Sequence, residues 1–124
     1  MVERAAPSAA GEGELVVVLV NAPAADAPKI ARALVEQRLC ACVNVVPGIK
    51  SFYFWEGKLT EDDESTLLIK TRQSRVEDLT RAVKGLHPYA VPEVIALPLV
   101  QGVGNPDYLA WVRDQVSGTG AENG

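Results

Sequence analysis

The sequence predicts an α+β fold of the ferredoxin-like, split βαβ type, with elements in the order β-α-β-β-α-β-α. Two observations carry this prediction. Extended runs rich in β-branched residues alternate with segments whose apolar residues recur at helical spacing. The 124 residues are enough for one domain and too few for two ordinary ones, and 48% hydrophobic against 23% charged residues is typical of a globular core.

The two ends of the chain differ from its middle. Residues 1–13 are mainly Ala, Pro, Gly, Ser and Glu without periodicity, and residues 117–124 read SGTGAENG. Such segments cannot bury enough apolar surface to fold, so we expect a disordered N-terminal lead-in and a flexible tail. A single ferredoxin-like domain is expected over residues 14–116.

The first strand and the first helix have clear signals. Residues Glu14 to Asn21 are apolar and β-branched almost throughout, which is typical of a strand covered on both faces. A helix is predicted over Asp26 to Arg38, with Asp26 as N-cap and Pro28 in the first turn. Its apolar stripe contains Ile30, Ala33 and Leu34.

A long hairpin is expected next. Leu39 to Trp55 forms an extended segment in which Pro47-Gly48 indicates a bulge or bend. Glu56-Gly57 predicts a tight turn into a second strand over Lys58 to Arg72, regular from Glu64 onward.

The second helix begins with a predicted capping box, formed by Ser74 and Glu77. It must end by His87, because Pro88 disfavours helical conformation in the residue before it. Its apolar stripe is Val76, Leu79, Val83 and Leu86.

The last two elements are a strand over Pro92 to Val100 and a C-terminal helix. Pro98 places the strand at an edge or a bulge of the sheet. Asn105 is the expected cap of the helix, with Pro106 at its first position and Asp107 near the positive end of the dipole.

This topology predicts an oligomer. Right-handed crossovers place both main helices on one face of the sheet. Three predicted strands contain consecutive apolar residues, in the runs Val16 to Val18, Leu67 to Ile69 and Val94 to Leu97. Alternate side chains in each run must point away from the helices. A monomer would then expose an apolar patch of more than a few hundred Å². We therefore expect the bare face to meet another copy of the chain.

Charge, hydropathy and cysteine content exclude several classes of protein. The net charge of −4 argues against a nucleic-acid partner. The longest apolar run, Leu15 to Val20, is far shorter than the roughly 20 residues of a membrane span. No export signal is visible, and two cysteines cannot form a disulfide framework. Reduced thiols and a cytoplasmic location are the expectation.

Few residues could carry chemistry. His87 is the single histidine, so it either caps a helix or ligates a metal, and a neighbouring chain could complete a site beside it. Cys40 and Cys42, two apart in a predicted strand, would share one face. They would form half of a soft-metal site or, as is more usual for free cysteines, lie buried as small hydrophobes. No nucleophile, base and orienting group form a complete set, so no enzyme is predicted.

Two runs on the hairpin have alternative interpretations. The aromatic run Phe52 to Trp55 would pack across strands or subunits, or serve as a binding platform. The acidic run Glu61 to Glu64 would be a solvated loop, or hold a hard cation, although it lacks the ligand spacing of a calcium loop.

Several blocks of this sequence resemble the CutA divalent-cation tolerance family. They are CACVNVVPGIKSFYFWEGKL, LLIKTRQS, LHPYAVPEVIALPL and NPDYLAWV, in the family's order and covering the body of the chain. The resemblance implies a tight homotrimer similar in shape to PII signalling proteins, with hairpins that extend sheets between subunits. It also implies a role in tolerance to divalent cations, notably copper, without an established catalytic reaction.

The same resemblance implies candidate ligands for Cu(II) or another divalent cation. Cys42 matches the family cysteine before the V/I-P-G bend, and His87 matches the histidine of the HPY motif. Val20 and Leu86 stand where the bacterial member that gave the family its name has a further cysteine and histidine. We therefore predict a weaker site centred on His87. The alternative is a PII-like trimer that binds a small ligand or partner protein in its inter-subunit clefts.

Overall fold

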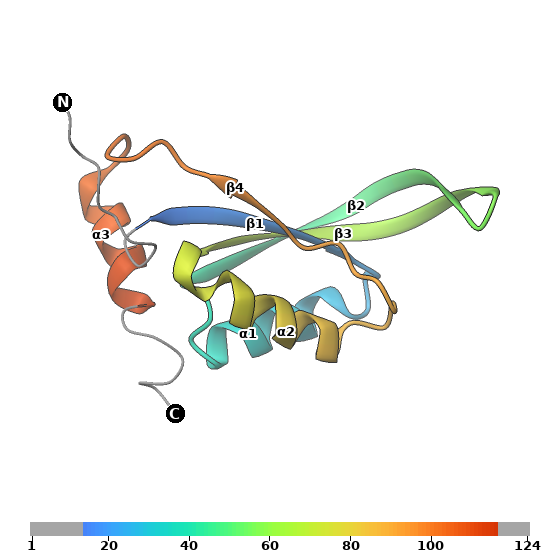
Figure 1. The fold of residues 1–124 in the computed structure, drawn as a ribbon, viewed down its shortest axis with the longest axis horizontal. Helices are drawn as coiled ribbons and strands as arrows, with labels where there is room; N and C mark the ends of the chain where they lie inside the picture. The colour runs from blue at the N-terminus through green and yellow to red at the C-terminus, as the bar shows by residue number, and fades with distance from the viewer. Residues whose placement is uncertain (1–13, 117–124) are drawn as a thin grey trace.

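A four-stranded antiparallel sheet with two helices packed on one face forms the body of the protein (Figure 1). The computed structural model describes residues 14–116, so the predicted disordered segments, 1–13 and 117–124, lie outside the described residues. The elements in chain order are β1 (Leu15–Ala22), α1 (Ala27–Glu36), β2 (Cys42–Trp55), β3 (Lys58–Arg72), the 3-10 turn η2 (Gln73–Arg75), α2 (Val76–Leu86), β4 (Ile95–Pro98) and α3 (Pro106–Gln115).

The topology confirms the predicted fold class. The strand order is β2-β3-β1-β4, and each neighbouring pair is antiparallel. Both crossovers place their helices, α1 and α2, on the same side of the sheet (Figure 1), as right-handed connections require. β1 and β3 are the central strands, while β2 and β4 form the two edges.

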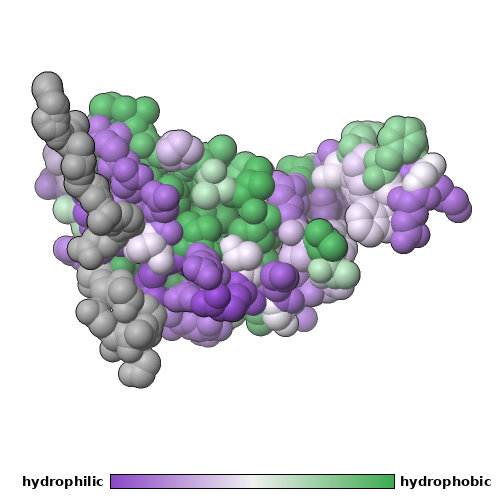
Figure 2. Space-filling view, viewed as in Figure 1, coloured by the Kyte–Doolittle hydropathy of each residue, from purple (hydrophilic) through white to green (hydrophobic). Residues whose placement is uncertain are grey.

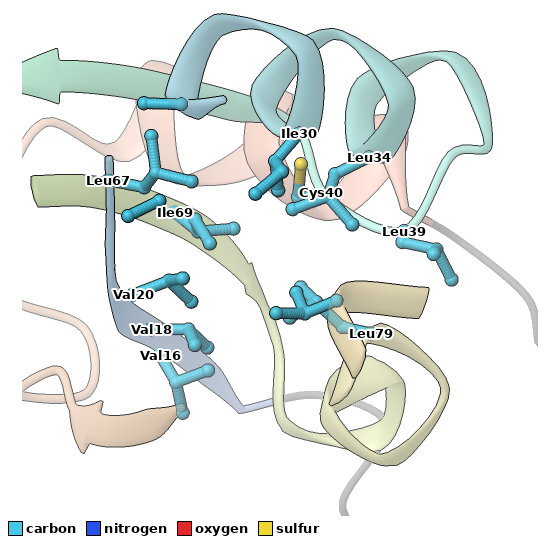
Figure 3. Packing of buried hydrophobic residues seen from close by; sticks show 13 residues of the cluster. Val16, Val18, Val20, Ile30, Leu34, Leu39, Cys40, Leu67, Ile69 and Leu79 are labelled. Atoms are coloured by element: carbon cyan, nitrogen blue, oxygen red, sulfur yellow. The ribbon is translucent and has the colours of Figure 1, made fainter. Parts of the chain in front are cut away.

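The hydrophobic core fills the space between the sheet and these two helices (Figure 3). Alternate residues of β1 and β3 point into it, because successive side chains of a strand face opposite sides. Fully burying one such Val, Leu or Ile stabilises the fold by about 1.5–3 kcal/mol. The main contributors are Val16, Val18 and Val20 of β1, Leu67 and Ile69 of β3, Ile30 and Leu34 of α1, and Leu79 and Val83 of α2.

The β2–β3 hairpin is a long arm that extends past the helices (Figure 1). Its tip is a two-residue turn in which Glu56 and Gly57 both have positive φ, 52° and 80°. These angles match the twist of the strands they join. The predicted bulge is present, since the register shifts between Val46 and Ile49. β3 is regular over its whole length, so the acidic run is paired strand and the loop interpretation was wrong.

The first two helices begin without the side-chain cap hydrogen bonds that the sequence predicted. Ser74 lies within η2, and α2 starts from Arg75 with no side-chain cap hydrogen bond, so the capping box was wrong. The 3-10 turn supplies a backbone bond instead, from the Val76 N–H to the Gln73 carbonyl. Asp26 holds the N-cap position of α1 but its carboxylate caps nothing. The cap of α3 is confirmed, because the Asn105 side chain accepts from the Asp107 N–H at 2.9 Å.

β4 is shorter than predicted. It spans four residues rather than Pro92 to Val100, and it pairs with β1 alone. Proline has no N–H to donate to a sheet, so the two prolines near its ends limit the ladder. Pro98 lies on an edge strand, as predicted.

The sheet face away from α1 and α2 is apolar and partly uncovered. Val17 pairs with Leu97 and Leu19 with Ile95, which places these four side chains on the face opposite the core. Leu97 and Ile95 are 47% and 49% exposed. α3 lies at the end of the sheet where β1 begins (Figure 1). Figure 2 shows apolar residues gathered over the middle of the molecule and again near the hairpin tip.

Arg75 is a buried charged residue whose guanidinium group has no hydrogen-bond partner among the described residues. The Arg75 side chain is 1% exposed, and no described residue accepts a hydrogen bond from any of its three guanidinium nitrogens. Removing a guanidinium from water without a partner opposes folding by several kcal/mol.

We therefore expect Arg75→Met, which keeps the length of the side chain, to raise the free energy of unfolding by about 1–3 kcal/mol. Urea unfolding at one fixed protein concentration measures the change. Arg81→Met is the matched control: Arg81 is exposed and pairs with Glu77 on the surface of α2, so its loss should change stability by less than about 1 kcal/mol. An Arg75→Met protein less stable than the wild type would contradict the absence of a partner.

Candidate functional site

His87 lies at the junction between α2 and the segment that leads to β4. It is the C-cap of α2, with extended backbone angles that end the helix at the predicted place. Its side chain is 7% exposed. The imidazole Nδ1 accepts a hydrogen bond from the Tyr89 N–H at 3.1 Å, and Nε2 lies 2.8 Å from the Asn21 carbonyl oxygen.

These two contacts identify the tautomer of the ring. A carbonyl oxygen accepts but cannot donate, so Nε2 carries the proton and Nδ1 presents its lone pair to the Tyr89 N–H. His87 thereby ties the end of α2 to the end of β1. A metal ion at Nδ1 would have to replace the bond from Tyr89, which contributes about 0.5–1.5 kcal/mol.

The two cysteines occupy different environments. Cys40 precedes β2 and belongs to the core cluster beside Ile30 and Leu34 (Figure 3). Cys42 opens β2 opposite Lys70, on the face away from that cluster. The prediction that both thiols share one strand face was wrong, because the strand begins only at Cys42. Burial raises the pKa of the Cys40 thiol to about 12.

Cys42 is half-buried and contacts α3. Burial raises the pKa of the Tyr108 phenol on α3. The Cys42 thiol raises it further, by its charge when ionised and by a hydrogen bond to the phenol. The phenol therefore remains protonated at neutral pH. Cys42 accordingly helps to seat α3 against the sheet.

The structure does not bring His87 and Cys42 together within one chain. His87 contacts Asn21, while Cys42 is aligned through Lys70 with Val17 of β1. Val17 and Asn21 are four positions apart on β1, which corresponds to roughly 13 Å along the strand. Across residues 14–116, no three His, Cys, Asp or Glu side chains form a group that could hold a metal ion.

A pocket of about 490 Å³ lies along one face of the hairpin arm, from Asn21 at the end of β1 to Trp55 beside the tip. The aromatic and acidic runs of the sequence supply four of its lining residues, but the sequence did not indicate that they meet the segment after α2. Asn21 belongs to the face away from the helices, so the pocket continues that face toward the arm. Its lining includes aromatic and acidic side chains from both hairpin strands and the segment after α2: Tyr53, Trp55, Asp62, Glu64, Tyr89 and Glu93.

Hydrogen bonds organise the acidic side of this pocket. The Tyr89 hydroxyl donates to Glu64 Oε2 at 2.9 Å, and the Ser51 hydroxyl donates to Glu64 Oε1 at 2.7 Å. The Tyr53 hydroxyl donates to Asp62. Burial and the bond to Glu64 raise the pKa of Tyr89, and the bond to Asp62 raises that of Tyr53. Both phenols are donors at neutral pH.

Comparison with known proteins decides the family. A family model described as CutA1 divalent ion tolerance protein matches residues 16–115. The chain belongs to the CutA1 divalent ion tolerance family. This confirms the resemblance drawn from the sequence blocks.

CutA1 relatives span bacteria, animals and plants. The divalent-cation tolerance protein CutA of Thermus thermophilus is 50% identical over 99 residues, covering 79% of this chain and 94% of the relative. The Xenopus laevis CutA homolog is 54% identical over 105 residues, covering 84% of this chain and 68% of its own.

Solved CutA1 structures share the fold. CutA1 from Oryza sativa superposes with a TM-score of 0.81 at 44% identity, covering 86% of this chain and 96% of its own. The PII-like protein CutA from Nostoc superposes with a TM-score of 0.76 at 32% identity, covering 82% of this chain and 96% of its own.

Among the described residues, no helix has the length and apolar character needed to cross a membrane.

The buried Cys40 thiol makes stability depend on alkaline pH. Its pKa is about 12 in the folded protein against the ordinary 9.0 expected once unfolded. The unfolded chain therefore loses its proton first, and this contribution to stability, complete below pH 9, declines as pH rises toward 12. Between about pH 8 and pH 10.5, we expect the free energy of unfolding to fall by about 2 kcal/mol from this group.

Urea unfolding of the wild type and Cys40→Ala across that pH range measures the effect. The variant loses some packing at every pH, so the comparison is the slope of stability against pH. The tyrosines contribute equally to both proteins. Equal slopes would show that Cys40 ionises as readily in the folded chain as in the unfolded one.

Proposed function

We propose that the protein acts in tolerance to divalent cations as a cytoplasmic homotrimer, which binds Cu(II) or another divalent cation without catalysing a reaction. The observation that carries the proposal is the match of the CutA1 family model to residues 16–115. Family members carry names that describe divalent-cation tolerance rather than an enzymatic activity. The two free cysteines, Cys40 and Cys42, favour a reducing compartment.

The homotrimer is supported by the apolar sheet face. In a single chain, Ile95 and Leu97 leave about half of their side chains in water. The hairpin arm adds an unpaired strand edge along β2, because β2 is the last strand of the sheet. Exposed edges and apolar faces favour association with another chain. A PII-like relative with the same fold agrees with the expected trimer.

The metal site is proposed at His87. Among residues 14–116 no metal-binding cluster forms around this imidazole, so we infer that residues across a subunit boundary complete the site. Binding at Nδ1 would replace the bond from the Tyr89 N–H, which agrees with a weak site. Cys42 lies at another level of the sheet and is proposed as a separate, secondary ligand.

A second candidate function is supported by the pocket along the face of the arm. A PII-like trimer would bind a small ligand, and the volume of about 490 Å³ lies within the range of small-molecule sites. In that case metal tolerance would be an indirect effect of ligand binding.

If the protein is a stable trimer, its mass in solution should stay constant over a wide range of protein concentration. Sedimentation of the wild type should give about three times the 13.3 kDa chain mass, and dilution to about nanomolar protomer should leave it unchanged. Leu97→Glu should dissociate it, because a carboxylate would be buried on the apolar face. Val35→Glu is the matched control, since Val35 is 40% exposed on α1, on the helical side. A monomeric wild type at micromolar concentration would refute the proposal.

The metal site predicts saturable binding that depends on His87. Calorimetric titration with Cu(II) and a weak competing chelator should saturate at a whole number of ions per trimer. His87→Gln retains an amide that can donate to the Asn21 carbonyl, yet it should abolish saturation, because amides are poor copper ligands. Cys42→Ser should weaken binding at most in part.

Cys40→Ala is the control for this titration, because its thiol is buried in the core and should not contribute. Circular dichroism and sedimentation verify that each variant is folded and trimeric. Equal binding by the wild type and His87→Gln would refute a site at His87.

A further inference from the structure

The pocket along the face of the arm carries negative charge, and its described lining offers no matching positive charge. Asp62, Glu64 and Glu93 all line it, and none of its described lining residues is basic. Their hydrogen-bond donors are neutral: two tyrosine hydroxyls, a serine hydroxyl and the Asn21 amide, which donates to Glu93 at 3.0 Å.

Glu64 is the central observation. The residue is 6% exposed, and each of its carboxylate oxygens is held by a hydroxyl. Carboxylates buried to this degree are normally paired with a cation. The nearby ion pair does not serve this purpose, because Lys50 bonds Asp63 at 2.6 Å, and Asp63 points to the opposite face of β3.

The wall of the pocket suits an organic cation. Tyr53, Trp55 and Tyr89 line it together with the aliphatic Val91. Aromatic faces attract ammonium and guanidinium groups, by about 0.5–2 kcal/mol each. The same faces bury methylene groups favourably.

The spacing of the carboxylates disfavours a bare metal ion. Across the described chain, no three acidic or other ligand side chains converge closely enough to hold one. Carboxylates spread around a cavity of about 490 Å³ match charges that are themselves separated. A cation with two or more charged ends and an aliphatic body meets both conditions.

We propose that this pocket binds an aliphatic polyamine-type cation. One ammonium group meets Glu64 and Asp62, the methylene chain lies along the aromatic wall, and a further ammonium group meets Glu93. The inference goes beyond the metal site at His87 and shares no ligand with it.

Tryptophan fluorescence tests the proposal on the full chain. The protein has two tryptophans, so Trp111→Phe leaves Trp55 as the reporter in the pocket. Titration with spermidine at constant ionic strength should change the Trp55 emission saturably, and putrescine should bind more weakly. Magnesium chloride at the same charge concentration should cause no saturable change.

Charge-neutralising variants locate the binding. Glu64→Gln keeps the shape but removes the buried charge: its amide oxygen still accepts from one hydroxyl, and its NH2 group donates to the other, whose oxygen becomes the acceptor. We expect at least a tenfold weaker affinity for spermidine. Asp63→Asn is the matched control: it removes the same charge from the adjacent residue, on the other face of β3, and should change the affinity less than twofold.

Three outcomes would overturn the proposal: no saturable binding of spermidine to the folded wild type, equal weakening by Glu64→Gln and Asp63→Asn, or equal competition by Mg²⁺. The first would show that the pocket does not take a polyamine in the folded protein. The other two would mean a general response to charge. All three outcomes are distinguishable from a failure of the copper titration, because that experiment depends on His87 and not on Glu64.

Discussion

The burial of β1 is the constraint on which the rest of the structure depends. This strand is hydrogen-bonded on both sides, by β3 and β4, and its inward side chains, such as Val18 and Val20, are fully removed from water. A shift of one residue would turn those side chains outward, so the register of both neighbours is fixed. The end of the same strand presents the Asn21 carbonyl to His87, which sets where α2 stops.

The outward face of that sheet links the two parts of the molecule that matter for function. Near the middle it carries the apolar side chains of β1 and β4, which favour a neighbouring copy. Toward the arm it becomes polar, first at Asn21, whose amide oxygen accepts from the Thr66 hydroxyl at 2.7 Å, and then at the acidic pocket. Assembly and ligand binding would thus use adjoining regions of one surface.

The sequence was sufficient for the fold but not for the site. Periodicity, Pro88, the Glu56-Gly57 turn and the Asn105 cap are local signals, and the structure agrees with each. The pocket joins residues far apart in the chain, so no window of sequence contains it. The acidic run was interpreted as a solvated loop because runs of carboxylates are usually loops, although the predicted Glu56-Gly57 turn already aligns this run with the aromatic one. The separation of Cys40 from Cys42 depends on where β2 begins, which is the least predictable property of a strand.

The bulge between Val46 and Ile49 also determines which chemistry each side of the arm displays. The extra residue reverses the odd–even alternation of β2 relative to β3. Tyr53 and Trp55 thereby share a side with Asp62, while Phe52 lies across from it. Deleting one residue here would exchange the two sides, placing phenylalanine beside the carboxylates and the tyrosine outside. The number of residues between Val46 and Ile49 therefore determines which side chains face the pocket. Inserting or deleting one residue there would have the effect of several simultaneous substitutions.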